Sequence, residues 1–100
     1  MAWRRIVSEV RPNKSTPFFE ASDDAKAYVT STYENTGKST SFAVTYSNDF
    51  LTKFKTRVFN NQSSRNEFLA DSTVQAIGTA HAAHCSSNST TRNIVEDKEI

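Results

Sequence analysis

The sequence predicts an α+β domain whose elements follow the order strand, helix, strand, strand, helix, strand. Three observations predict it: two segments carry apolar residues at helical spacing, residues 40–59 alternate between apolar and polar side chains around a polar turn, and β-prone segments lie near both ends. This order is the βαββαβ arrangement of ferredoxin-like domains, with a four-stranded antiparallel sheet and two helices on one face. Residues 1–100 are expected to form a single domain.

The first strand and the first helix are predicted by local signals. β-prone residues run from Trp3 to Arg11 and stop at Pro12, which has no N–H to donate to a sheet. A helix is expected from Asp23 to Asn35, because Ser22 is a good N-cap and the two aspartates that follow suit the positive end of a helix dipole. Gly37 is placed to end this helix in the left-handed conformation.

The middle of the chain predicts a hairpin. Residues Thr40 to Tyr46 alternate between apolar and polar side chains, as a half-buried strand does. Ser47, Asn48 and Asp49 are turn-forming residues. The alternation resumes from Phe50 to Phe59, so the two runs are expected to pair as antiparallel strands.

The longest predicted helix runs from Ser63 to Cys85. Ser64 and Glu67 have the spacing of a capping box at its start. One face of this helix is marked by residues spaced three and four apart: Ala70, Val74, Ile77, His81 and His84. Residues 71–73 are weak helix formers and predict a kink or break. A short last strand is expected from Arg92 to Glu96.

Composition limits the classes of partner. The net charge is +1, from 12 basic and 11 acidic residues, so there is no general attraction to nucleic acid or to an anionic membrane. The lone Cys85 has no internal disulfide partner, and the two arginines near the N-terminus precede no apolar run of the kind found in signal peptides. A cytoplasmic protein is the expectation.

The sheet face opposite the helices is expected to be an interface. The first strand carries apolar residues on both of its sides, and the next-to-last strand carries Leu51 and Phe59 on the side opposite Phe54. A second copy packing sheet against sheet would cover such a face. The candidate interface residues are Trp3, Val7, Leu51, Lys53, Lys55, Arg57 and Phe59. The alternative is that the three basic residues of this row keep the face solvated.

His81, His84 and Cys85 come nearest to a chemical site. His81 and Cys85 are one helical turn apart, so both can present ligands to one metal ion. Further ligands would have to be carboxylates, since the chain has no other histidine or cysteine. The alternative is ordinary packing, because histidines near a helix C-terminus are favoured by the dipole. We expect packing, and no metal, cofactor or catalytic residue.

A row of basic residues with an aromatic ring on one strand is also a feature of sheet-face RNA binding. Here the row is Lys53, Lys55, Arg57 and Phe59. The glycines and further aromatic rings of that signature are missing, and the net charge is near zero. A nucleic-acid partner is therefore not expected.

Several phrases of the sequence resemble uncharacterised short proteins of marine tailed phages. These phrases are MAWRRIV at the start, PFFE at 17–20, TYENTGKS at 32–39, TYSNDFLT at 45–52 and NEFLADSTV at 66–74. The resemblance transfers no active residue. It implies a non-enzymatic protein of the virion or the host cytoplasm, such as a virion accessory or decoration subunit.

Three functions follow as hypotheses. The first is a phage structural or assembly protein that acts as a homo-oligomer or docks on other virion proteins. The second is a small enzyme that resembles dimeric α+β barrels in topology, with a pocket between sheet and helices and a role for His81 or His84. The third is a host-directed binding module that uses Lys53, Lys55 and Arg57.

Overall fold

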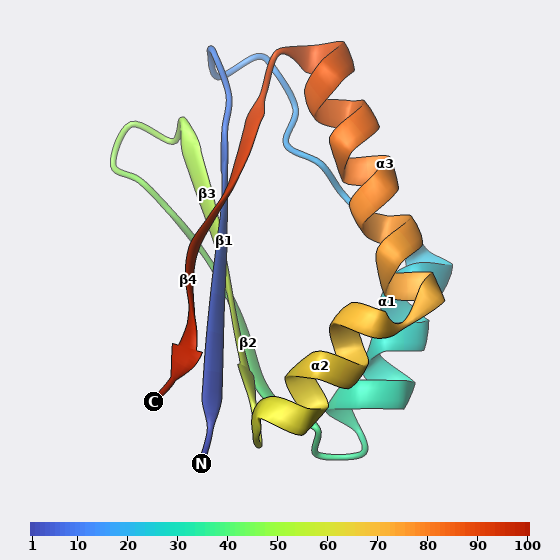
Figure 1. The fold of residues 1–100 in the computed structure, drawn as a ribbon. Coiled ribbons are helices and arrows are strands. Elements are labelled where there is room, and N and C mark those ends of the chain that lie inside the picture. The colour runs from blue at the N-terminus through green and yellow to red at the C-terminus, as the bar shows by residue number, and fades with distance from the viewer.

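The computed structural model describes residues 1–100, which form a four-stranded antiparallel sheet with helices on one side (Figure 1). The elements are β1 (Trp3–Val10), α1 (Asp23–Val29), η1 (Thr30–Glu34), β2 (Ser39–Tyr46), β3 (Thr52–Phe59), α2 (Gln62–Ala70), α3 (Ser72–Asn88) and β4 (Thr91–Glu99). The strand order is β2-β3-β1-β4. The predicted α+β class and four-stranded antiparallel sheet are confirmed. The strict βαββαβ order is not adopted, because the second helical region divides into α2 and α3.

The first helical region begins and ends as its sequence signals predict. The Ser22 hydroxyl accepts a hydrogen bond from the backbone N–H of Ala25 at 3.2 Å. The helix continues beyond α1 as η1, a π-helical segment, and Gly37 follows with a φ of 79°. That φ is in the left-handed region, which glycine adopts at little steric cost.

Asp71 divides the second helical region. Its backbone is extended, with φ −69° and ψ 127°, and its Oδ1 accepts from the N–H groups of Thr73 at 2.8 Å and Val74 at 3.3 Å. Asp71 is therefore the N-cap of α3. The predicted break is confirmed, whereas the predicted capping box is wrong because Asn61 caps α2 by accepting from Ser64.

The same carboxylate joins the two helical regions. Asp71 Oδ2 accepts from the hydroxyls of Tyr28 at 2.6 Å and Tyr33 at 2.7 Å. Tyr33 is 1% exposed, and its ring packs on Phe68 of α2 at 5.1 Å between centroids. Burial tends to raise the pKa of Asp71, but the four hydrogen bonds that it accepts outweigh burial and lower that pKa. Burial and the Asp71 charge raise the pKa of Tyr33.

The sheet differs from prediction at its ends. β3 begins at Thr52 rather than Phe50, because Phe50 closes the hairpin with a φ of 58°. β4 extends over Thr91–Glu99, beyond the predicted 92–96, because it pairs with the whole of β1 across a bulge.

The hairpin is tied to the loop after β1, since Arg11 Nε donates to the Phe50 carbonyl at 2.9 Å and the Arg11 guanidinium lies 4.2 Å from the Phe18 ring centroid.

The register of β1 and β3 identifies the side of the sheet that faces the helices. Glu9 pairs with Lys53, and the Glu9 carboxylate contacts His81 of α3. Because alternate residues of a strand point the same way, the helix-facing side also holds Trp3, Val7, Lys55, Arg57 and Phe59. The expected placement of these residues on the uncovered face is therefore wrong, and Leu51 lies in the turn before β3.

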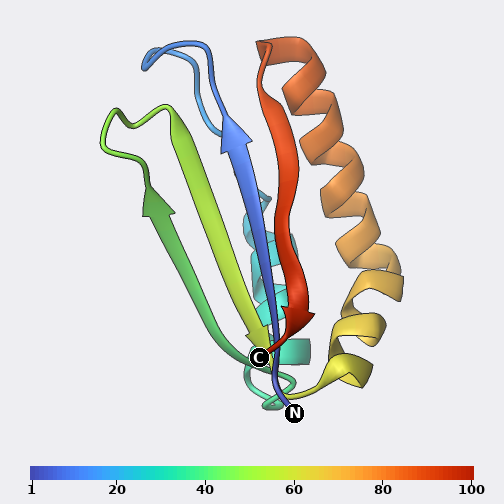
Figure 2. The same cartoon turned by 60° about the vertical axis from the view of Figure 1, so that its left-hand side comes forward.

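The uncovered face is visible on the far side of the sheet from α2 and α3 (Figure 2). It carries the other alternating set of β1 and β3, which is mostly small, hydroxylated or apolar. Its apolar members are Ile6, Val10, Phe54 and Val58. The charged residues of β3 lie on the opposite side, where Lys53 pairs with Glu20 and Arg57 pairs with Glu34.

Replacing Asp71 with alanine is expected to lower the free energy of unfolding by roughly 2–4 kcal/mol. Loss of the N-cap costs about 1 kcal/mol. The buried Tyr33 hydroxyl also loses its hydrogen bond to Asp71, which costs about 1–3 kcal/mol more. Urea denaturation measures this change. Asp71→Asn keeps one acceptor oxygen for the N-cap and should cost less than Asp71→Ala, although its amide nitrogen cannot accept from the two tyrosine hydroxyls.

The matched control is Asp24→Ala, which removes an exposed acidic residue from the first turn of α1. Its expected effect is about 0.5 kcal/mol, the scale of a dipole interaction. Equal losses in the two alanine variants would contradict the assigned role of Asp71.

Candidate functional site

A cavity lies between the helix-facing side of the sheet and the helices. Its volume is about 630 Å³, which is in the range of small-molecule sites. All four strands, the three α-helices and η1 contribute to its wall. A pocket between sheet and helices, which only the second of the three hypotheses requires, is therefore present in the structure.

Part of the cavity wall is apolar. The side chains that form it are Val29, Phe42, Val44, Phe68, Leu69, Val74 and Ile77. Phe42 and Val44 are 45% and 40% exposed although they lie on the helix-facing side of β2. These two side chains are therefore accessible apolar surface for the body of a ligand.

The rest of the wall is strongly basic. Six basic residues line the cavity (Arg5, Lys26, Lys53, Lys55, Arg57 and Arg92) against two acidic ones. Glu20 pairs with Lys26 at 2.9 Å and with Lys53 at 3.2 Å. Glu34 pairs with Arg57 at 3.0 Å, which leaves the other three basic residues without a close ion pair inside the cavity. The cavity therefore carries a net positive charge.

Lys55 and Arg92 make no ion pair, and Arg5 makes only a long one. No carboxylate lies within ion-pair distance of the Lys55 ammonium, which is 5.4 Å from the centroid of the Phe19 ring. Burial, reinforced by the charge of Lys53, lowers the pKa of Lys55. Arg5 Nε is buried without a hydrogen bond and lies 3.8 Å from Asp97. Burial also lowers the pKa of Arg5.

Glu9 forms a second cluster at one end of the cavity. Its side chain is 1% exposed, and its Oε1 accepts from the Phe19 N–H at 3.1 Å. His81 Nε2 lies 3.2 Å from Oε1, and His84 Nε2 lies 3.4 Å from Oε2. The Phe19 ring stacks on the His81 ring, with centroids 4.6 Å apart.

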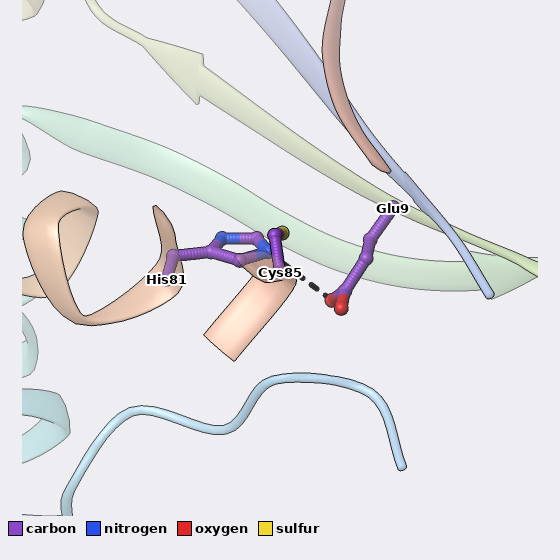
Figure 3. A group of neighbouring side chains, drawn as sticks. All are labelled: Glu9, His81 and Cys85. Atoms are coloured by element: carbon purple, nitrogen blue, oxygen red, sulfur yellow. Dashed lines mark ion pairs between the residues drawn. The ribbon is translucent and has the colours of Figure 1, made fainter. Parts of the chain in front are cut away.

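The structure brings the three predicted ligand candidates to Glu9 in different ways. His81, Cys85 and Glu9 each place one ligand atom within 4.8 Å of the others (Figure 3). His84 Nε2 instead lies 3.0 Å from the carbonyl oxygen of Pro17, which can accept its proton. Burial, together with the charge of Lys55, lowers the pKa of His81 to about 4, so its ring is neutral at pH 7.

Sequence reasoning missed Glu9 and Arg5 as site residues. Both belong to β1, far in sequence from the helix and strand that complete the site. The available signal was their position in the alternating pattern, because both share a side of the strand with the apolar Val7. A charged residue on the same side as buried apolar ones indicates a buried polar site.

Comparisons of the chain with protein-family models, curated proteins and solved structures give no match. None of the helices has the length and apolar character needed to cross a membrane. The functional argument therefore rests on the geometry of the cavity and of the Glu9 cluster.

Replacing Lys55 with methionine is expected to raise the free energy of unfolding by about 1 kcal/mol, because methionine keeps the stem in place and removes a partly buried cation that has no counter-ion. Urea denaturation at pH 7 measures the change. Lys98→Met is the control, since Lys98 is 61% exposed and should change stability by less than about 0.5 kcal/mol. A loss of stability in Lys55→Met would show that the ammonium is satisfied within the protein.

Proposed function

We propose that this protein binds a small organic anion with an apolar body in the cavity between its sheet and its helices. The observation that carries the proposal is the charge of Lys55, which makes no ion pair, beside an accessible apolar wall. A partly buried cation without an ion pair lowers stability, so its presence is explained if a ligand completes the pair. The anionic group would lie near Lys55 and Arg5, and the apolar body near Phe42 and Val44.

The cavity suits this class of ligand in size and in composition. Its volume exceeds that of an inorganic ion and matches small organic molecules. The Arg5 guanidinium lines the cavity, and its one ion pair is long, 3.8 Å to Asp97. A carboxylate, phosphate or sulfonate group accepts such donors and gains strength in a partly buried site.

Binding of aromatic anions should be detectable by ¹H–¹⁵N NMR titration. Phenyl phosphate and phenylacetate are expected to shift backbone amides of β3 and α3 in a saturable manner, whereas benzyl alcohol, a neutral molecule of similar shape, should bind far more weakly. Lys55→Met should weaken binding of both anions roughly tenfold, the effect of losing one charge-assisted hydrogen bond. Lys98→Met, on the uncovered face, should leave the affinity for both anions unchanged.

The affinity should also depend on pH. Because the pKa of Lys55 lies below the ordinary 10.5, binding should weaken as the pH rises toward that value and the ammonium loses its proton. Affinity for benzyl alcohol equal to that for the anions would contradict the proposal.

We also propose, as a second candidate, that the uncovered sheet face assembles with a second copy or with another virion protein. This candidate now rests on Ile6, Val10, Phe54 and Val58, which replace the seven interface residues expected from the sequence. Two such faces packed together would follow the usual geometry of sheet-on-sheet packing. The split second helix is compatible with a variant of the ferredoxin-like arrangement, in which that face is free. The expected places of action remain the host cytoplasm or the virion.

The second candidate predicts an oligomer in solution that Phe54→Lys dissociates, because a lysine ammonium is costly to bury in an apolar interface. Sedimentation equilibrium measures the mass. Ser87→Lys, which adds the same side chain on an exposed part of α3, is the control and should leave the mass unchanged. A wild-type mass equal to one chain at all concentrations would remove self-assembly.

A further inference from the structure

The Glu9 cluster combines three kinds of metal ligand from two elements. Glu9 comes from β1, and His81 and Cys85 come from successive turns of α3. One oxygen, one nitrogen and one sulfur atom all lie within 4.8 Å of one another. In Figure 3 the His81 ring and the Glu9 carboxylate point toward each other, with Cys85 beside them.

His81 Nε2 has no hydrogen-bond partner, although its side chain is almost fully buried. His81 is 4% exposed, and Nε2 makes no hydrogen bond within the protein. Glu9 Oε1 is 3.2 Å away, but the two atoms do not have the geometry of a hydrogen bond. An ion bound to both atoms would give His81 Nε2 the partner that it lacks.

The separation of the two atoms suits a shared metal ion. Two ligand atoms that each lie about 2.1 Å from a tetrahedral ion are about 3.4 Å apart. The observed 3.2 Å between Nε2 and Oε1 is close to this value. His81 Nε2 has no hydrogen-bond partner in the protein, whereas His84 Nε2 already has the Pro17 carbonyl as partner.

We propose that Glu9, His81 and Cys85 form a binding site for a zinc-class transition metal. A thiolate, an imidazole and a carboxylate together favour Zn²⁺ over Mg²⁺ or Ca²⁺, which prefer oxygen ligands. Binding releases the Cys85 thiol proton, and the two negative ligands then balance the charge of Zn²⁺. The fourth position is open to water.

Charge balance matters because two cations lie near this site. The positive charges of Lys55 and Arg92 act on His81 and oppose the approach of a metal ion. A zinc site with one thiolate and one carboxylate has no net charge, so the two cations do not repel the complete complex. Removing the Lys55 charge should therefore maintain or strengthen metal binding.

Cobalt(II) titration of untagged, metal-free protein tests the site, with no organic anion present. We expect one Co²⁺ per chain, a thiolate-to-cobalt charge-transfer absorption in the near ultraviolet, and loss of that absorption when Zn²⁺ is added. Cys85→Ser should abolish the absorption, and His81→Gln should weaken Co²⁺ binding by about tenfold or more. Circular dichroism confirms that each variant is folded.

Ser87→Ala is the control, because it changes an exposed residue of α3 that is not one of the three ligands, and it should retain the absorption and the affinity. Absence of the charge-transfer absorption in wild type, or a weakening of Co²⁺ binding in Ser87→Ala as large as in His81→Gln, would overturn the proposal. Lys55→Met separates this site from the anion site, since it should lose affinity for phenyl phosphate while it keeps Co²⁺.

Discussion

The charged side chains on the helix-facing side of β1 and β3 are the constraint on which the rest of this structure depends. A sheet that packs on helices normally presents apolar residues to them. Here Arg5, Glu9, Lys53, Lys55 and Arg57 occupy that side, and each needs a polar partner or water. An apolar layer cannot close on such a row, so a cavity separates sheet from helices and its wall carries both charge and apolar surface.

Asp71 connects the helices that form the other side of that cavity. One oxygen of its carboxylate starts α3, and the other binds the hydroxyls of Tyr28 and Tyr33 from the first helical region. The segments that cover the sheet are thereby joined at one point near their middle. The cavity can remain open while the helices stay fixed, because their mutual position depends on this junction as well as on contact with the sheet.

The sequence predicted the elements better than it predicted the site. Ser22, Gly37 and the break at Asp71 act through neighbouring residues, so their roles can be read from local chemistry. The side of the sheet that meets the helices could not be read in the same way, since both alternating sets of β1 and β3 contain apolar residues. The alternating pattern of β1 places Glu9 on the same side as Val7, but it does not identify His81 and Cys85 as the residues that Glu9 meets, because they belong to a distant segment.

The hairpin turn supports the Glu9 cluster, which lies at the same end of the sheet because Glu9 pairs with Lys53, the second residue of β3. Phe50 holds a left-handed backbone conformation and offers its carbonyl to Arg11, which also binds the Thr16 carbonyl and covers Phe18. The next residue, Phe19, donates to Glu9 and stacks on His81. The hairpin turn thus helps to hold the buried Glu9 cluster in place, so substitutions in that exposed loop would also affect the position of Phe19 against Glu9 and His81.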